Sequence, residues 1–253
     1  MSPRRSVKQT NDSTLRPSQI DEVRRPATTG WRGVLTVGAA AALGSVALIV
    51  VQVAVFAVSP PPEDAAGVVT LLQSNPVLGL VSLDALYLVN NILVALLYLA
   101  LTVALYARAR SLATIALTLG LLGMAAYFGS NPSLELLTLA DQAREASVSH
   151  RAALMIEADA LLAAWRGTAF LTYYFLGAAA LLLFATAMLR TGQFSRATGT
   201  AALAAGVLML VPSTFGLVGM VFSLLSLVPW SVMCVLAARR LLALARASTT
   251  FTT

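Results

Sequence analysis

The sequence predicts an all-α, polytopic membrane protein: a bundle of six transmembrane helices with a helical extracytoplasmic loop between the third and fourth. Three observations support this fold class. Of the 253 residues, 58% are hydrophobic and only 11% are charged, whereas a typical soluble domain is about 25% charged. Several apolar runs have the length that crosses a lipid bilayer. The basic residues gather in the segments that separate alternate runs.

The apolar runs define the six predicted helices. A transmembrane helix needs about 20 apolar residues, and residues 197–238 form an uncharged run that is too long for one crossing. We divide this run at Pro212 and Gly216, because proline and glycine favour a turn. The predicted helices cover residues 33–58, 80–106, 112–128, 168–189, 197–211 and 217–238.

The basic residues predict the orientation of the chain. If the N-terminus is cytoplasmic, 14 of the 17 lysines and arginines fall in cytoplasmic segments, and only Arg144, Arg151 and Arg166 fall outside. Cytoplasmic loops of membrane proteins carry such an excess, so we expect both termini in the cytoplasm. The composition, rich in arginine, alanine and leucine, is typical of a high-GC bacterial genome. These features predict a multi-pass protein of the bacterial cytoplasmic (inner) membrane.

Two polar segments flank the predicted membrane domain of residues 31–246. Residues 1–30 are basic and poor in apolar side chains. They are predicted to form a disordered cytoplasmic tail, because such a segment buries too little apolar surface to offset the entropy of folding. Residues 247–253 are predicted to form a short second cytoplasmic tail.

The outer loop, residues 131–166, is rich in helix-forming residues. Leu154, Ala158, Leu161 and Trp165 repeat at helical spacing and define one apolar face. Three arrangements are open for this loop. Its helices extend the third and fourth spans, lie on the membrane surface, or cover the mouth of the bundle.

Polar residues of the second predicted helix form the candidate functional site: Asp84, Tyr87, Asn91 and Tyr98. On one continuous helix these residues share a stripe, and Asn90 lies about 100° away. A charge at the bilayer centre costs about 2.5–3.5 kcal/mol, so the stripe is expected to face the bundle interior or a water-filled vestibule. It either has a structural role or forms a cation or proton site with a polar path below it.

Two further features are interpreted as structural. Tyr173 and Tyr174, in the outer half of the fourth helix, are interpreted as aromatic anchors at the membrane interface, with ligand binding as the alternative. Pro229, which precedes Trp230, predicts a bend in the sixth helix.

Several functional classes lack their sequence patterns. The single cysteine, Cys234, excludes an intramolecular disulfide, and the single histidine, His150, argues against bis-histidine haem or a histidine-rich zinc site. No catalytic or nucleotide-binding motif is present. The basic residues border the apolar runs and form no basic stripe with interleaved aromatic residues, so nucleic acid is not an expected partner. We therefore predict no cofactor, no metal site and no catalytic residue.

Three segments carry a resemblance to a known family: "GTAFLTYYFLGAAALLLFATAMLR", "FSRATG…AAGVLMLVP" and "LVPWSVMCVLAARRLLAL". Through them the chain resembles an uncharacterised bacterial six-span integral membrane protein family, defined only as a domain of unknown function. The resemblance covers about residues 35–245. It implies a six-helix membrane fold and implies no activity or site residue.

The functional prediction follows from these features. A non-enzymatic membrane protein that binds a small ligand or a protein partner, as a scaffold or sensor, needs only packing surfaces and an accessible site. The alternative is a small-solute or ion permease that uses the polar stripe on the second helix. The expected partners are the lipid bilayer and either another membrane protein or a second copy of the chain.

Overall fold

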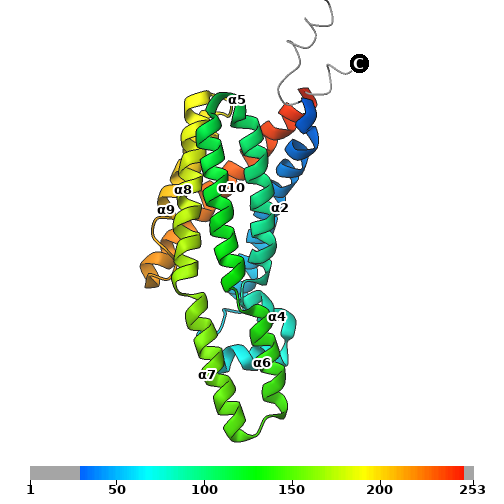
Figure 1. Ribbon diagram of the computed structural model, residues 1–253, viewed down its shortest axis with the longest axis vertical. Helices are drawn as coiled ribbons and strands as arrows, with labels where there is room; N and C mark the ends of the chain where they lie inside the picture. The colour runs from blue at the N-terminus through cyan, green and yellow to red at the C-terminus, as the bar shows by residue number, and fades with distance from the viewer. Residues whose placement is uncertain (1–28, 248–253) are drawn as a thin grey trace, which may run out of the picture.

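A computed structural model of the chain describes residues 29–247. Among these residues every regular element is a helix, which confirms the predicted all-α class (Figure 1). The two predicted tails fall almost wholly outside the described residues. A 3-10 turn at Thr29–Trp31 is followed by α2 (Arg32–Val58), α3 (Ala65–Ser74), α4 (Pro76–Ser82), α5 (Ala85–Ser130), α6 (Ser133–Glu145), α7 (Val148–Trp165), α8 (Thr168–Thr191), α9 (Arg196–Leu208) and α10 (Gly216–Ala247).

Within residues 29–247, four helical segments are long and apolar enough to cross a membrane. They are α2, Ala85–Glu145, Val148–Thr191 and α10. This count differs from the six predicted helices for two reasons. The second and third predicted helices both lie within α5, and α9 has only 13 residues, or about 20 Å, against a hydrocarbon core of about 30 Å.

Helix α5 folds back on itself at Ala109, whose φ of −143° and ψ of 47° are not helical. The Thr102 hydroxyl lies 3.3 Å from the Ala113 carbonyl oxygen and donates a hydrogen bond to it. A Cβ atom at Gly120 would lie 2.6 Å from the Tyr98 ring, although the two residues would be about 33 Å apart on a straight helix. The two halves of α5 therefore lie antiparallel (Figure 1).

The bundle is formed by α2, both halves of α5, α8, α9 and α10, which share one apolar core. Leu97, Phe184 and Met233 are fully buried in it. Small residues bring α2 close to α5, because a Cβ atom at Gly38 would lie only 2.1 Å from that of Ala100. Such close approach of backbones favours helix association within lipid.

A second apolar core lies beyond one end of the bundle, between α3, α4, α6 and α7. Leu72, Leu136 and Ala158 are buried there. The sequence analysis assigned no structure to α3 or to most of α4. Asp64 caps α3 by accepting a hydrogen bond from the Gly67 backbone N–H at 2.7 Å. We call these four helices the outer domain.

The apolar face predicted on the loop lies inside this outer domain. Leu154, Ala158 and Trp165 are buried against its other helices, and Leu161 is partly buried there. Helices α6 and α7 form an antiparallel pair that continues the directions of α5 and α8 away from the bundle (Figure 1). The face therefore packs against protein within the outer domain.

The second predicted helix is interrupted, which corrects the range 80–106. Helix α4 ends at Ser82 and α5 begins at Ala85, because Asp84 has a positive φ of 60°. The Leu83 carbonyl oxygen accepts hydrogen bonds from the Asn131 amide and the Ser133 hydroxyl, each at 2.9 Å. These bonds tie the break to the start of the outer domain.

The opposite end of the bundle is basic. The turn of α5, the α8–α9 connection and the end of α10 meet there, together with the start of α2 (Figure 1). Arg108 donates a hydrogen bond to the Thr191 carbonyl oxygen at 3.2 Å, and Arg240 donates one to the Gln193 carbonyl oxygen at 2.8 Å.

Candidate functional site

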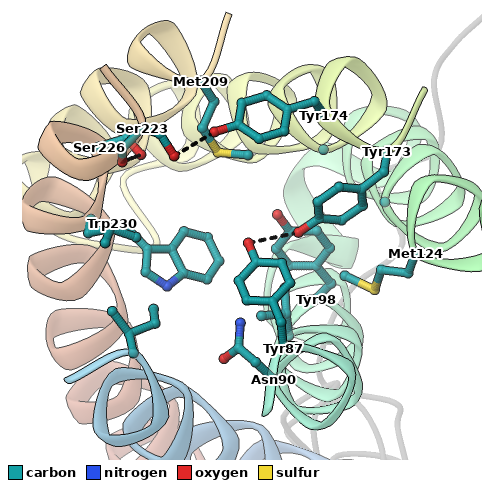
Figure 2. A pocket seen from close by; sticks show the side chains of 15 residues that line it. Tyr87, Asn90, Tyr98, Met124, Tyr173, Tyr174, Met209, Ser223, Ser226 and Trp230 are labelled. Atoms are coloured by element: carbon teal, nitrogen blue, oxygen red, sulfur yellow. Dashed lines mark hydrogen bonds between the residues drawn. The ribbon is translucent and has the colours of Figure 1, made fainter. Parts of the chain in front are cut away.

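A cavity of about 70 Å³ lies inside the bundle, bounded by residues of α2, α5, α8 and α10 and by Met209. Five aromatic side chains form much of its wall, and none of the described residues that line it is charged. The indole of Trp230 faces Tyr87 across the cavity (Figure 2). The aromatic residues of the wall are Tyr87, Tyr98, Tyr173, Tyr174 and Trp230.

Two hydrogen-bonded pairs fix part of this wall. The Tyr173 hydroxyl donates a hydrogen bond to the Tyr87 hydroxyl at 3.0 Å, and the Tyr174 hydroxyl donates one to Ser223 at 2.8 Å (Figure 2). Tyr173 also packs against Tyr127, with ring centroids 4.9 Å apart. The tyrosines of α8 are therefore held in place by α5 and by α10.

Three polar side chains of the wall lack a hydrogen-bond partner among the described residues. They are Asn90, Tyr98 and Trp230, which are 4%, 3% and 9% exposed. The Asn90 side-chain oxygen is completely enclosed and unpartnered, and the amide nitrogen points into the space between Tyr87 and Trp230 (Figure 2). A buried polar group without a partner costs about 1–3 kcal/mol. The enclosed Asn90 oxygen has no surface open to the cavity, so the groups placed to bond a molecule inside it are the Asn90 amide nitrogen, the Tyr98 hydroxyl and the Trp230 indole.

The structure separates the four predicted site residues. Tyr87 and Tyr98 line the cavity, whereas Asp84 and Asn91 do not. The Asn91 amide donates a hydrogen bond to the Tyr87 carbonyl oxygen at 3.1 Å, one turn earlier on the same helix. The polar residue that joins Tyr87 and Tyr98 at the cavity is Asn90.

Asp84 lies in the break between α4 and α5, at the end of the bundle next to the outer domain and outside the candidate membrane-spanning helices. Its Oδ2 atom accepts a hydrogen bond from the Tyr127 hydroxyl at 3.2 Å. Burial raises the pKa of the Asp84 carboxyl to about 6, and the bond from Tyr127 lowers it by a smaller amount. The left-handed backbone conformation at Asp84 is one that aspartate tolerates better than most residues.

The sequence analysis did not include Asn90, Trp230, Tyr173 or Tyr174 among the candidate site residues, although all four line the cavity. The two tyrosines are 8% and 6% exposed, so they are buried in the bundle, and their prediction as interfacial anchors is wrong. Helix α10 continues through Pro229, and the next residue, Trp230, lines the cavity. The sequence signal that could have identified this site is the presence of several tyrosines and an asparagine in two helices that pack against each other.

A wider groove of about 640 Å³ lies at the basic end, between Trp31, Tyr106 and Arg108. Its polar side chains are largely partnered. The buried hydroxyl of Thr102 bonds the Tyr98 carbonyl oxygen at 2.8 Å, and Arg108 bonds the α8–α9 connection. The groove therefore lacks the unpartnered, enclosed groups that distinguish the cavity at Asn90.

The described residues contain no group of three or more His, Cys, Asp or Glu side chains that could hold a metal ion. No protein-family model, curated protein or solved structure matches the chain. The site is therefore interpreted from its own geometry. Its chemistry is that of an enclosed aromatic pocket with uncharged hydrogen-bonding groups, which suits binding of an uncharged molecule.

Proposed function

We propose that the chain is a non-enzymatic membrane protein that binds a small ligand in the cavity beside Asn90. The observation that carries this proposal is that Asn90, Tyr98 and Trp230, each no more than 9% exposed, line one space and make no side-chain hydrogen bond among the described residues. Ligand sites are usually apolar and aromatic pockets with a few polar groups that orient the ligand. The cavity has this composition.

We further propose that the chain crosses the bacterial inner membrane six times, with both termini in the cytoplasm. The fold-back of α5 at Ala109 supports separate second and third crossings. The gathering of Arg108, Arg190 and Arg240 at the end opposite the outer domain supports the orientation. Reporter fusions at residues 64, 109 and 193 test it. We expect an externally active reporter only at residue 64, and external activity at residue 109 or 193 contradicts it.

The expected partners follow from the surface of the bundle. Val50, Leu224 and Val228 are 62%, 51% and 63% exposed on α2 and α10. Apolar side chains of this kind contact lipid in a membrane-spanning bundle. They also provide the face on which a second copy of the chain or another membrane protein would dock.

A ligand screen tests the binding function. A ligand that binds the folded state raises its stability, so fractions of a bacterial extract, both water-soluble and lipid-soluble, are added to the protein in detergent and its melting temperature is measured. We expect at least one fraction to stabilise the wild type and the Asn91→Leu variant, but not the Asn90→Leu variant. Equal stabilisation of all three proteins, or of none, contradicts the proposed function.

A permease is the second candidate, and the contacts of Asp84 favour it. Tyr127 bonds Asp84 and also packs against Tyr87, with ring centroids 5.5 Å apart. This chain of side chains links a titratable group to the cavity. Asp84→Asn keeps the shape and removes the charge, so loss of solute or proton uptake by proteoliposomes of that variant would favour the permease.

A further inference from the structure

We infer that the cavity holds the flat, carbonyl-bearing ring of an uncharged lipophilic compound, and that this ring enters sideways from the bilayer past Val53 of α2, through a second cavity lined by α2, α5 and Leu227 of α10. The ligand class is that of a ring with carbonyl oxygens attached to an apolar chain. This inference rests on the proposed ligand-binding function and specifies its ligand.

Two of the groups that line the cavity, the Trp230 indole and the Asn90 amide nitrogen, can only donate hydrogen bonds, whereas the hydroxyls of the wall can donate or accept. The Trp230 indole can only donate, and the Asn90 amide nitrogen points into the space (Figure 2). The Tyr87 hydroxyl accepts its bond from Tyr173, which leaves the Tyr87 hydrogen free to donate. A ligand that satisfies these groups must present acceptor oxygens, and carbonyl oxygens are the acceptors that an uncharged ring provides.

The walls favour a flat ring. Tyr87 and Trp230 face each other across the space (Figure 2). Tyr87 already packs edge-on against Tyr127 and Tyr173, with centroids 5.5 and 6.1 Å away. Trp230 lines the cavity and takes part in none of the ring pairs among the described residues, so no aromatic side chain occupies the face on which an aromatic or quinonoid ring would stack. Ring pairs of this kind are favourable at centroid distances of about 4.5–7 Å.

A second cavity gives the ring a route to lipid. It has a volume of about 60 Å³ and shares Ile49, Tyr87, Asn90 and Leu227 with the first. Its wall also includes Val53, which is 41% exposed on the outer face of α2. No charged residue lines it among those described. Gln52, whose side-chain nitrogen bonds the Val81 carbonyl oxygen at 3.2 Å, is the one polar residue of this wall before Tyr87 and Asn90 among those described.

The sizes of the two cavities limit what fits. At about 70 and 60 Å³, they suit a compact head group and the first part of a chain. A long apolar chain extends past Val53 into the bilayer. The protein therefore holds the polar end of the ligand and leaves the tail in lipid.

Equilibrium binding to protein in lipid nanodiscs tests this inference. The probe is a fully substituted 1,4-benzoquinone with a decyl chain, and the quinone retained by protein-containing nanodiscs is compared with that retained by empty ones. The controls are the corresponding hydroquinone, in which each carbonyl is replaced by a hydroxyl that donates as well as accepts, and decylbenzene, which has the ring and chain but no oxygen. We expect saturable binding of the quinone, binding of the hydroquinone about tenfold weaker, and no saturable binding of decylbenzene.

Variants locate the bound quinone. Asn90→Leu and Trp230→Phe each remove one donor and keep the approximate shape, so we expect binding to weaken about tenfold to a hundredfold. Asn91→Leu changes the adjacent residue, which does not line the cavity, and should leave affinity within about twofold. Ile49→Trp fills the junction of the two cavities and should slow association.

The outcomes separate this inference from the proposed function. Tighter binding of the hydroquinone than of the quinone contradicts the assignment of a carbonyl-bearing ring as the ligand. Stabilisation of the wild type only by a charged, water-soluble compound, again lost in Asn90→Leu, overturns the lipophilic class and the lateral route but leaves the binding function standing. If no extract fraction stabilises the protein and no quinone is retained, the cavity holds water only, and both proposals fail.

Discussion

Replacing Asn90 by leucine should make the ligand-free protein more stable, although Asn90 is a buried polar residue on a central helix. Its side chain is 4% exposed and has no hydrogen-bond partner among the described residues. An unpartnered buried polar group costs about 1–3 kcal/mol, and replacing it by an apolar group of similar shape removes that cost. We expect the free energy of unfolding to rise by about 1 kcal/mol.

Asn91 is the matched control for this experiment. Its amide bonds the Tyr87 carbonyl oxygen at 3.1 Å, and polar bonds within membrane helices contribute about 0.6 kcal/mol on average. Asn91→Leu should therefore lower the free energy of unfolding by about 0.5–1 kcal/mol. Both variants are measured by reversible unfolding in mixed detergent and SDS micelles. A loss of more than 1 kcal/mol in ligand-free Asn90→Leu would refute the view that Asn90 awaits a ligand, and would assign it a structural role.

Three further predictions concern the fold around the site. The pKa of Asp84 is about 6 in the folded protein and near 4 when unfolded. The contribution of Asp84 to the free energy of unfolding is therefore largest below about pH 4 and is lost as the pH rises through about 6. The loss should be about 1–3 kcal/mol between pH 4 and 8 and absent in Asp84→Asn; an equal loss in the variant contradicts it. Gly38→Val should weaken the α2–α5 contact at Ala100 by about 1–3 kcal/mol, measured by SDS unfolding, and unchanged stability would show that the two helices are not so close. Leu136→Ala should destabilise the outer domain by about 2–5 kcal/mol and expose it to protease while the quinone still binds; loss of binding would show that the two cores are coupled.

The sequence was sufficient to predict an all-helical fold with long apolar helices, because long apolar runs of this kind form helices in a bilayer. The second and third predicted helices are separated by Arg108 and Arg110, and α5 turns between them at Ala109. A charged pair between two long apolar runs has little alternative to a turn at the membrane surface. The lengths of the runs did not predict the number of long apolar helical segments, which is four among the described residues and not six.

The break before α5 could not be predicted from local sequence. Residues 80–83 are apolar or small and would extend a helix, whereas the bonds that stop it come from Asn131 and Ser133, nearly fifty positions later. The outer domain was missed for the same reason. Its core joins α3 and α4 to α6 and α7, and pairing between distant segments leaves no periodic signal in either one.

The candidate site was predicted in part, and the difference has a specific cause. The predicted stripe assumed that Asp84 lies on the same continuous helix as Tyr87, and its count began at Asp84. Because Asp84 has a left-handed backbone and precedes the helix, it does not fix which face points inward. Tyr87 and Tyr98 still line the cavity, but Asn90 accompanies them in place of Asn91.

Native mass spectrometry of the protein released from its own membrane tests the central claim most directly. Wild-type protein and Asn91→Leu should each carry one bound, uncharged, lipophilic molecule of the same mass, and Asn90→Leu should appear without it. A bound mass that is identical in all three proteins, or absent from all three, would contradict a ligand site beside Asn90.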